Sequence, residues 1–206
     1  MSQFFNPYLK VDQHGSKLPH WQQGEAFVFV TYRLADSLPV ELLRTWKAER
    51  EVWLAKHPLP WDQQTKANYN ERFTARMDHW LDQGRGSCLL KQVETRKLVV
   101  SALIHFDRKR YQMVSFVVMP NHVHALFQPL AGNLLEDIIH SWKSFSSKEI
   151  KKLTGYSDDV WMSGYWDRLI RNRQHFDRCV RYIHENPIKA KLSEQAFTHY
   201  EDLSVI

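Results

Sequence analysis

The chain has 206 residues, of which 43% are hydrophobic, 25% are charged and 13% are aromatic. This composition excludes the disordered and low-complexity classes, and it supplies enough apolar surface for a single domain over residues 1–206. No apolar stretch approaches the roughly 20 residues of a membrane-spanning helix, and the N-terminal residues lack the pattern of a secretory signal. The two cysteines, Cys88 and Cys179, cannot form a disulfide framework. We therefore expect a protein of the reducing cytoplasm with no membrane partner.

The positive charge is concentrated toward the C-terminus. The formal net charge is +5, and residues 143–191 contain eleven Lys or Arg against six Asp or Glu, the same excess as the whole chain. Such a region is typical of a surface that binds an anionic partner, but a set of solvated helix faces would have the same composition. Charge alone therefore leaves both interpretations open.

The first half of the chain indicates one strand followed by helices. Residues 27–33 are rich in β-branched and aromatic side chains and predict a buried strand. Start and stop signals then predict a helix over about 39–55 and a second, polar helix over about 63–81. Together these helices form an insertion at about 40–86. The apolar spacing over 89–106 predicts a further helix that packs on a sheet.

A hairpin and a helix follow. Residues 111–119 and 122–128 are apolar, β-favouring runs on either side of Pro120-Asn121, which predicts two antiparallel strands. Asn133 and Glu136 have the spacing of a capping box, and a helical apolar face begins directly after them.

The last predicted helix covers about 174–186, because Pro187 cannot continue the hydrogen-bonding pattern of a helix. The order strand, helix, hairpin, helix, connector, helix predicts an α+β fold in which helices pack on one face of an antiparallel sheet.

Two histidines on the second strand of the hairpin form a candidate metal site. His122 and His124 are two residues apart, so both imidazoles point from the same face of the sheet. Imidazole is the commonest metal-binding side chain, and this pair offers a partial site for Mn²⁺, Mg²⁺ or Zn²⁺ that needs a third group. A surface pattern without a metal is the alternative.

The last helix supplies candidates for the remaining groups. Tyr182 and Asn186 are four residues apart, so they lie close together on one side of this helix. Tyr182 falls about 200° beyond Val180 of the apolar stripe. This position favours a role in a cleft rather than in packing, with the Asn186 amide oxygen as a possible third ligand.

Several motifs carry a resemblance to a known family. The longest are residues 120–124 (PNHVH), 166–171 (WDRLIR) and 182–189 (YIHENPIK). Shorter ones are residues 18–21 (LPHW), 33–39 (RLADSLP) and 142–146 (WKSFS). Together they resemble the REP-associated tyrosine transposases, which are relatives of the IS200/IS605 family within the HUH endonucleases, and the likeness spans most of the chain.

The resemblance implies a ferredoxin-like core and assigns roles to the candidate residues. It implies that His122, His124 and Asn186 bind a divalent metal ion, Mg²⁺ or Mn²⁺, and that Tyr182 attacks DNA. The implied activity is that of a metal-dependent single-stranded DNA endonuclease and strand transferase, which cleaves at or near palindromic repeats through a 5′-phosphotyrosine intermediate. The implied partners are single-stranded DNA and DNA hairpins of the nucleoid, bound by a monomer or a homodimer.

Two positions depart from the family pattern. Met162 stands where the family pattern leads us to expect Gln, and Lys191 stands where relatives often carry Gly. Neither change removes a catalytic group. They put the substrate contacts and the turn after the last helix in doubt.

Basic residues of the C-terminal region are candidates for contacts with the DNA backbone. They are Lys143, Lys148, Arg168, Arg171, Arg173 and Arg178. Trp161, Tyr165 and Trp166 are candidates for stacking on unpaired bases, with core packing as the alternative for each. Two other functions remain open: a DNA-binding protein of palindromic repeats that has lost transposition, and a metal-dependent phosphoesterase that uses water.

Overall fold

The computed structural model describes residues 3–14, 20–58 and 60–205, so Leu18 and Pro19 of the LPHW motif lie outside the described residues. A five-stranded antiparallel sheet forms the centre of the molecule, with the strand order β6-β3-β5-β4-β7. Its strands are β3 (Val28–Arg33), β4 (Tyr111–Val118), β5 (His122–Pro129), β6 (Trp166–Leu169) and β7 (Thr198–Glu201). A separate two-stranded sheet pairs β1 (Asp12–His14) with β2 (His20–Gln22).

The first four strands of the large sheet follow a ferredoxin-like plan. In chain order the elements are β3, α4 (Val93–His105), β4, β5, α5 (Leu135–Thr154) and β6. This βαββαβ order, with the last strand next to the first, places β3 and β5 at the centre of the sheet. The predicted α+β class and antiparallel hairpin are therefore confirmed, and β7 extends the edge beside β4.

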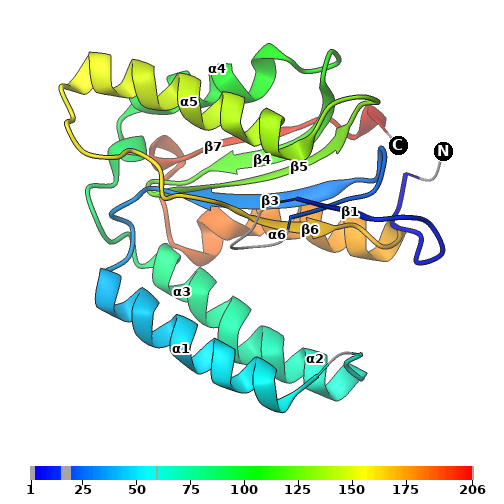
Figure 1. Ribbon diagram of the computed structural model, residues 1–206. Helices are drawn as coiled ribbons and strands as arrows, with labels where there is room; N and C mark the ends of the chain where they lie inside the picture. Colours follow the sequence, from blue (N-terminus) through cyan, green and yellow to red (C-terminus); the bar gives the residue numbers. More distant parts are fainter. Residues whose placement is uncertain (1–2, 15–19, 59, 206) are drawn as a thin grey trace.

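Helices cover both faces of the sheet, which differs from the expectation that they pack on one face. Figure 1 shows α4 and α5 above the sheet and α6 (Arg173–Lys189) below it. Every residue of β5 is buried, so both of its faces need a cover. Val123 and Ala125 pack in the core beneath α4 and α5, whereas Leu126 packs with Phe176 and Ile183 of α6.

The predicted insertion forms a layer of its own. It consists of α1 (Val40–Lys56), α2 (Gln63–Tyr69), a π-helical turn (Asn70–Ala75) and α3 (Arg76–Asp82). Figure 1 shows these helices beneath α6 and β6, on the side of the sheet opposite α4 and α5. The buried apolar side chains of these helices and of Leu38, just before α1, form a cluster separate from the two cores of the sheet: Leu38, Leu43, Trp46, Trp53, Phe73, Met77 and Leu81.

The chain returns from the insertion through a close contact with the turn after β3. Gly86 has φ +85°, and a Cβ atom at this position would lie 2.5 Å from the Asp36 carbonyl oxygen. The Ser87 amide donates a hydrogen bond of 2.6 Å to the Asp36 carboxylate. Glycine is required here because no side chain fits between the two segments.

Two predicted helix boundaries are wrong. The capping residue of α5 is Leu134 rather than Asn133, because the Asn133 amide instead donates to the carbonyls of Leu130 and Ala131 and closes the preceding turn. Helix α6 continues through Pro187 to Lys189, and the Ala190 amide donates to the Asn186 carbonyl. A proline removes only one hydrogen bond of the last turn, which tertiary packing tolerates here.

No helix of the described residues is long and apolar enough to cross a membrane.

Candidate active site

The two predicted histidines lie side by side on the face of the sheet that α6 covers. In the pairing of β5 with β3, His122 is opposite Arg33 and His124 is opposite Thr31. The centroids of the two imidazole rings are 4.7 Å apart, and each residue is 1% exposed. The structure thus brings both side chains to one place in a buried environment.

Each imidazole is oriented by a hydrogen bond to its Nδ1 atom. His122 Nδ1 lies 2.8 Å from the Asn121 side-chain oxygen, and His124 Nδ1 lies 2.7 Å from the Thr31 hydroxyl. An amide oxygen only accepts, so His122 Nδ1 carries the proton and its Nε2 keeps a free lone pair. This is the tautomer that a histidine ligand needs, with its other nitrogen fixed by a neighbour.

Burial keeps both imidazoles neutral. It lowers the pKa of His122 to about 3, and burial together with the neighbouring His122 lowers the pKa of His124. The neutral ring is the form that binds metal ions, so the pair is ready as a ligand at physiological pH.

Asn186 of α6 completes a possible ligand set. It is 2% exposed, and its side-chain nitrogen lies 3.4 Å from His124 Nε2. Its side-chain oxygen is buried and has no hydrogen-bond partner among the described residues. Because buried polar atoms are normally paired, this free oxygen fits a ligand that would bind next to the imidazoles. Within the described part of the chain, no three His, Cys, Asp or Glu side chains could hold a metal ion, so the third protein ligand would be this amide.

Tyr182 lies one helical turn before Asn186 and contacts the same imidazole. The centroid of its ring is 5.1 Å from that of His124 and 5.8 Å from that of Phe29, both in edge-to-face geometry. Its hydroxyl is buried, and it has no hydrogen-bond partner within 3.5 Å among the described residues. Burial raises the pKa of Tyr182, and the carboxylate of Asp78 raises it further.

Two acidic residues of α3 reach this tyrosine, and the sequence did not predict either of them as a site residue. Burial raises the pKa of Asp78, although its interaction with the Tyr182 hydroxyl acts in the opposite direction. Burial and the neighbouring Asp78 raise the pKa of Asp82 to about 6. Lys189 Nζ lies 5.7 Å from the centroid of the Tyr182 ring, and its charge lowers the pKa of both carboxyl groups. The spacing of Asp78 and Asp82 placed them on one helix face, but only the fold identifies what that face meets.

Arg33 is a second residue that the sequence did not single out as a site residue. It is 2% exposed, and its guanidinium donates to the Ser37 hydroxyl at 2.8 Å and lies over the Trp166 ring. Burial lowers the pKa of Arg33 to about 10, so it stays charged at neutral pH. It brings a cation to the edge of the site, directly opposite His122.

Three of the six predicted DNA-contact residues lie together, and the other three lie apart from them. Arg168, Arg171 and Arg178 lie together, because all three contribute to lowering the pKa of His175 to about 4, after burial as the main cause. Lys148 is exposed on α5, on the opposite face of the sheet from Tyr182.

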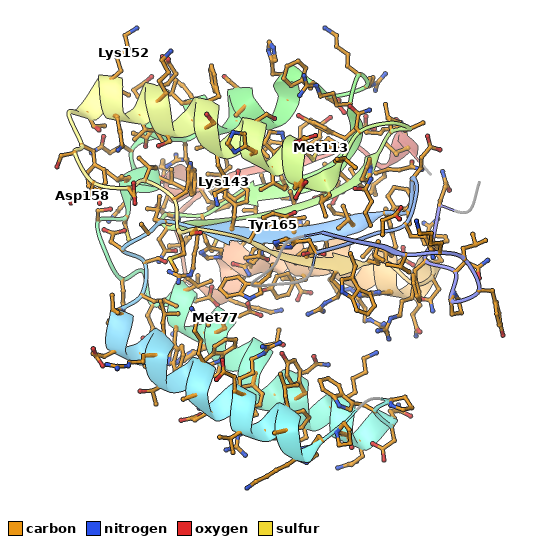
Figure 2. All side chains as sticks on the ribbon, viewed as in Figure 1. Met77, Met113, Lys143, Lys152, Asp158 and Tyr165 are labelled. Carbon is orange, nitrogen blue, oxygen red and sulfur yellow. The ribbon has the colours of Figure 1, made fainter. Side chains whose placement is uncertain are left out.

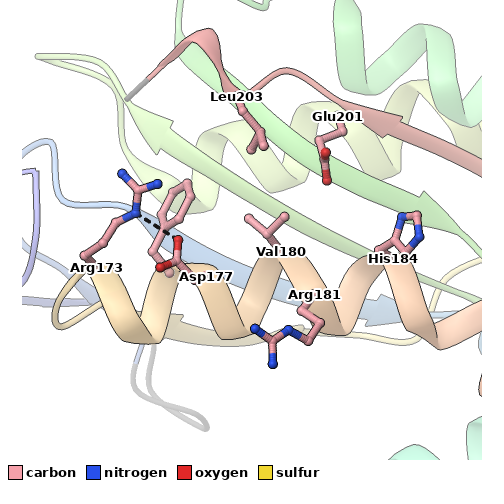
Figure 3. Close-up of a pocket in the computed structure, with 8 residues that line it drawn as sticks. Arg173, Asp177, Val180, Arg181, His184, Glu201 and Leu203 are labelled. Atoms are coloured by element: carbon pink, nitrogen blue, oxygen red, sulfur yellow. Dashed lines mark hydrogen bonds and ion pairs between the residues drawn. The ribbon is translucent and has the colours of Figure 1, made fainter.

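Lys143 and Arg173 make contacts within the protein. Lys143 Nζ donates to the carbonyls of Met162 and Gly164, both at 2.8 Å, between α5 and the following connector (Figure 2). Arg173 pairs with Asp177 at 2.8 Å beside a groove of about 250 Å³ between α6 and the C-terminal segment (Figure 3). Neither residue belongs to the arginine group near His175.

The aromatic residues of the connector pack inside the protein. Tyr165 stacks on His20 with ring centroids 3.8 Å apart. Trp161 is buried and donates to the Ser146 hydroxyl at 2.9 Å. Trp166 packs against the apolar cluster of the insertion. Core packing therefore accounts for Tyr165 and Trp161, whereas Trp166 is half-buried and keeps part of its ring exposed.

Comparison with known proteins identifies the family. A REP-associated tyrosine transposase bound to a REP hairpin aligns over 88% of this chain and 77% of its own, with 16% identity and a TM-score of 0.45. A protein of Deinococcus radiodurans R1 assigned as a transposase aligns over 84% and 96%, with 11% identity and a TM-score of 0.34. Among curated proteins no match was found. The sequence matches the family described as "Transposase IS200 like" over residues 80–186, just over half of its length. The chain therefore belongs to the IS200-like transposase family.

Proposed function

We propose that this transposase is a metal-dependent single-stranded DNA endonuclease and strand transferase of the REP-associated tyrosine transposase type. The observation that carries the proposal is the contact between Tyr182 and His124, beside the unpartnered amide oxygen of Asn186. A phenol, two neutral imidazoles and a free amide oxygen meet at one point, which is the set of groups that the reaction requires.

The reaction transfers a phosphodiester from DNA to the protein. Tyr182 Oη attacks the phosphorus, the bond from phosphorus to the 3′ oxygen breaks, and the 3′ oxygen takes up a proton. The products are a 5′-phosphotyrosine and a free 3′ hydroxyl. The covalent intermediate stores the bond energy of the phosphodiester, so the strand can be rejoined without ATP.

His122, His124 and Asn186 would hold a divalent cation, Mg²⁺ or Mn²⁺. When bound, the cation would neutralise phosphate charge and stabilise the crowded transition state. The hydrogen bond that His122 Nδ1 donates to the Asn121 oxygen and the contact of His124 Nδ1 with the Thr31 hydroxyl support this assignment, because they orient both rings and leave a lone pair on His122 Nε2.

The proton of the Tyr182 hydroxyl must leave before or during the attack. We propose that the Asp78 carboxylate accepts it. This carboxylate and the Tyr182 hydroxyl influence each other's pKa, and no other carboxylate acts on the phenol as strongly. An acceptor with a raised pKa suits this task, because it takes up a proton more readily than an ordinary aspartate.

The resemblance of the PNHVH and YIHENPIK motifs to REP-associated enzymes supports hairpins of palindromic repeats as the substrate. The test uses a library of hairpin oligonucleotides with randomised single-stranded flanks, labelled at the 3′ end and incubated with Mn²⁺. Attack by Tyr182 leaves the labelled 3′ portion on the protein, so a slower labelled band appears on a denaturing gel.

Tyr182→Phe removes only the attacking oxygen and should abolish this band while single-strand binding persists. Tyr165→Phe is the matched control and should retain the band. Cleavage without an adduct in both variants would indicate water as the nucleophile, and binding without cleavage by the unaltered protein would indicate a DNA-binding protein. Either result would overturn the proposal.

A further inference from the structure

A cluster of positive charges extends from the helical insertion to the sheet and α6. It comprises Lys66 of α2, Arg168 of β6, Arg171 of the loop after β6 and Arg178 of α6. Partial burial lowers the pKa of Lys66, and the three arginines lower it further, so the Lys66 ammonium group lies within electrostatic range of all three. Figure 1 shows α2 beneath the end of α6 that begins at Arg173, which is consistent with this proximity.

The four charges form no salt bridge with a carboxylate in the described part of the protein. None of them belongs to a salt bridge within 4.0 Å, although neighbouring cations do: Arg173 pairs with Asp177, and Lys189 pairs with Glu185. Like charges brought together without carboxylates repel each other and oppose folding. A cluster of this kind, built from separate parts of the chain, suits a partner that carries several negative charges.

The cluster extends to the nucleophile. In the pairing of β6 with β3, Arg168 lies opposite Phe29, and the Phe29 ring contacts both Tyr182 and His124. Arg168 also acts on the carboxylate of Asp78, which faces Tyr182. The positive charges therefore run from Lys66 on the insertion to Arg168, whose charge lowers the pKa of the Tyr182 hydroxyl.

We propose that the insertion is one wall of the DNA-binding track, in which Lys66 binds a backbone phosphate of the same single strand that Arg168, Arg171 and Arg178 guide to Tyr182. This inference rests on the proposed function and gives the insertion a role in it. Phosphates along a strand are regularly spaced anions, and a row of cations on two walls would contact several of them.

The test is the salt dependence of binding to an oligothymidine strand, measured by fluorescence anisotropy. Lys66→Gln removes one charge at an exposed position of α2. Each phosphate contact contributes roughly 0.7 to the slope of the logarithm of affinity against the logarithm of salt. The variant should therefore lose about 0.7 of slope and bind about eightfold more weakly at 50 mM salt.

Lys56→Gln is the matched control. Lys56 is exposed on α1 of the same insertion, and it is not among the charges that lower the pKa of Lys66 or His175. The salt-dependence slope of the Lys56→Gln variant should equal that of the unaltered protein. Lys66→Arg should restore most of the lost slope, and equal melting temperatures would exclude a structural effect.

The outcomes distinguish this inference from the proposed function. If the unaltered protein binds the strand and forms the Tyr182 adduct while Lys66→Gln keeps the full slope, the insertion is not a wall of the track and only this inference fails. If the unaltered protein does not bind single strands at all, both fail.

Discussion

The side chain of Asn121 connects His122 to the helical insertion. Its oxygen accepts the hydrogen bond from His122 Nδ1 at 2.8 Å, while its nitrogen donates to the carbonyls of Leu81 at 3.1 Å and Arg85 at 3.3 Å. One amide thus orients a proposed metal ligand and holds the end of α3. The position of the insertion and the orientation of His122 are coupled through this residue.

Asn121→Ala should weaken the binding of Mn²⁺ by roughly 10- to 100-fold, as losses of residues that orient metal-binding histidines do. The freed carbonyls near α3 should also reduce the free energy of unfolding by about 1–3 kcal/mol. Isothermal titration calorimetry with Mn²⁺ measures the first effect. Asn133→Ala, which removes an amide from a distant turn, should leave the Mn²⁺ affinity unchanged. Equal affinities in both variants would contradict the role of Asn121.

Asp78→Asn should slow adduct formation by about 100-fold, because it removes the proposed proton acceptor and keeps the shape of the side chain. Single-turnover kinetics on a labelled hairpin measures this rate. Asp82→Asn, one helical turn further along α3, should have a much smaller effect, since Asp82 acts on Tyr182 more weakly than Asp78 does. Similar rates for the two variants would show that the effect is one of net charge.

Asp82 should make stability depend on pH. Burial raises the pKa of Asp82 to about 6 in the folded protein, above its ordinary value of 3.8. The folded state therefore binds more protons than the unfolded state between about pH 4 and pH 6, and the contribution of Asp82 to stability falls as the pH rises through this window.

Asp82→Asn removes this penalty. Its melting temperature should equal that of the unaltered protein near pH 4 and exceed it above pH 7. In a chain of this size, each kcal/mol added to the free energy of unfolding raises the melting temperature by roughly 2–4 °C. Calorimetric melts at both pH values provide the measurement. An equal gain in melting temperature at both pH values would mean that ionisation of Asp82 is not the cause.

Lys191→Gly should stabilise the protein. Lys191 follows α6 with φ +53°, a conformation in which a side chain crowds the following carbonyl at a cost of about 1–2 kcal/mol. Glycine removes this cost, and the greater entropy of its unfolded chain offsets part of the gain. We expect a net gain of about 0.5–1 kcal/mol, visible in denaturant unfolding. Ala190→Gly is the contrasting control, because Ala190 has φ −76° and no strain to relieve.

The alternation of side chains along a strand made the histidine pair predictable. A period of two residues places His122 and His124 on one face wherever the strand lies in the sheet. The helical spacing of Tyr182 and Asn186 is equally local, so it also held. The turn at Lys191, where relatives often carry Gly, adopts a conformation that favours Gly.

Features that depend on distant segments were not predictable. Nothing near Asp78 in the sequence indicates that this residue will face Tyr182 of α6, since the two residues are 104 positions apart in the chain. The positive charge of Lys143 made it a candidate for DNA contact, yet its ammonium group donates hydrogen bonds to two carbonyls of the connector. From the local sequence, Pro187 should end α6. The helix continues through it because packing of α6 on the sheet compensates for the one hydrogen bond that the proline removes.

The apolar cluster of the insertion is independent of the two cores of the sheet. Separate clusters of this kind unfold and fluctuate as separate cooperative units. Two contacts nevertheless join it to the sheet: Trp166 of β6 packs against the cluster, and the Asn121 side chain donates hydrogen bonds to the carbonyls of Leu81 and Arg85. Local opening of the insertion would therefore break the hydrogen bonds of Asn121 and release the imidazole that this side chain orients.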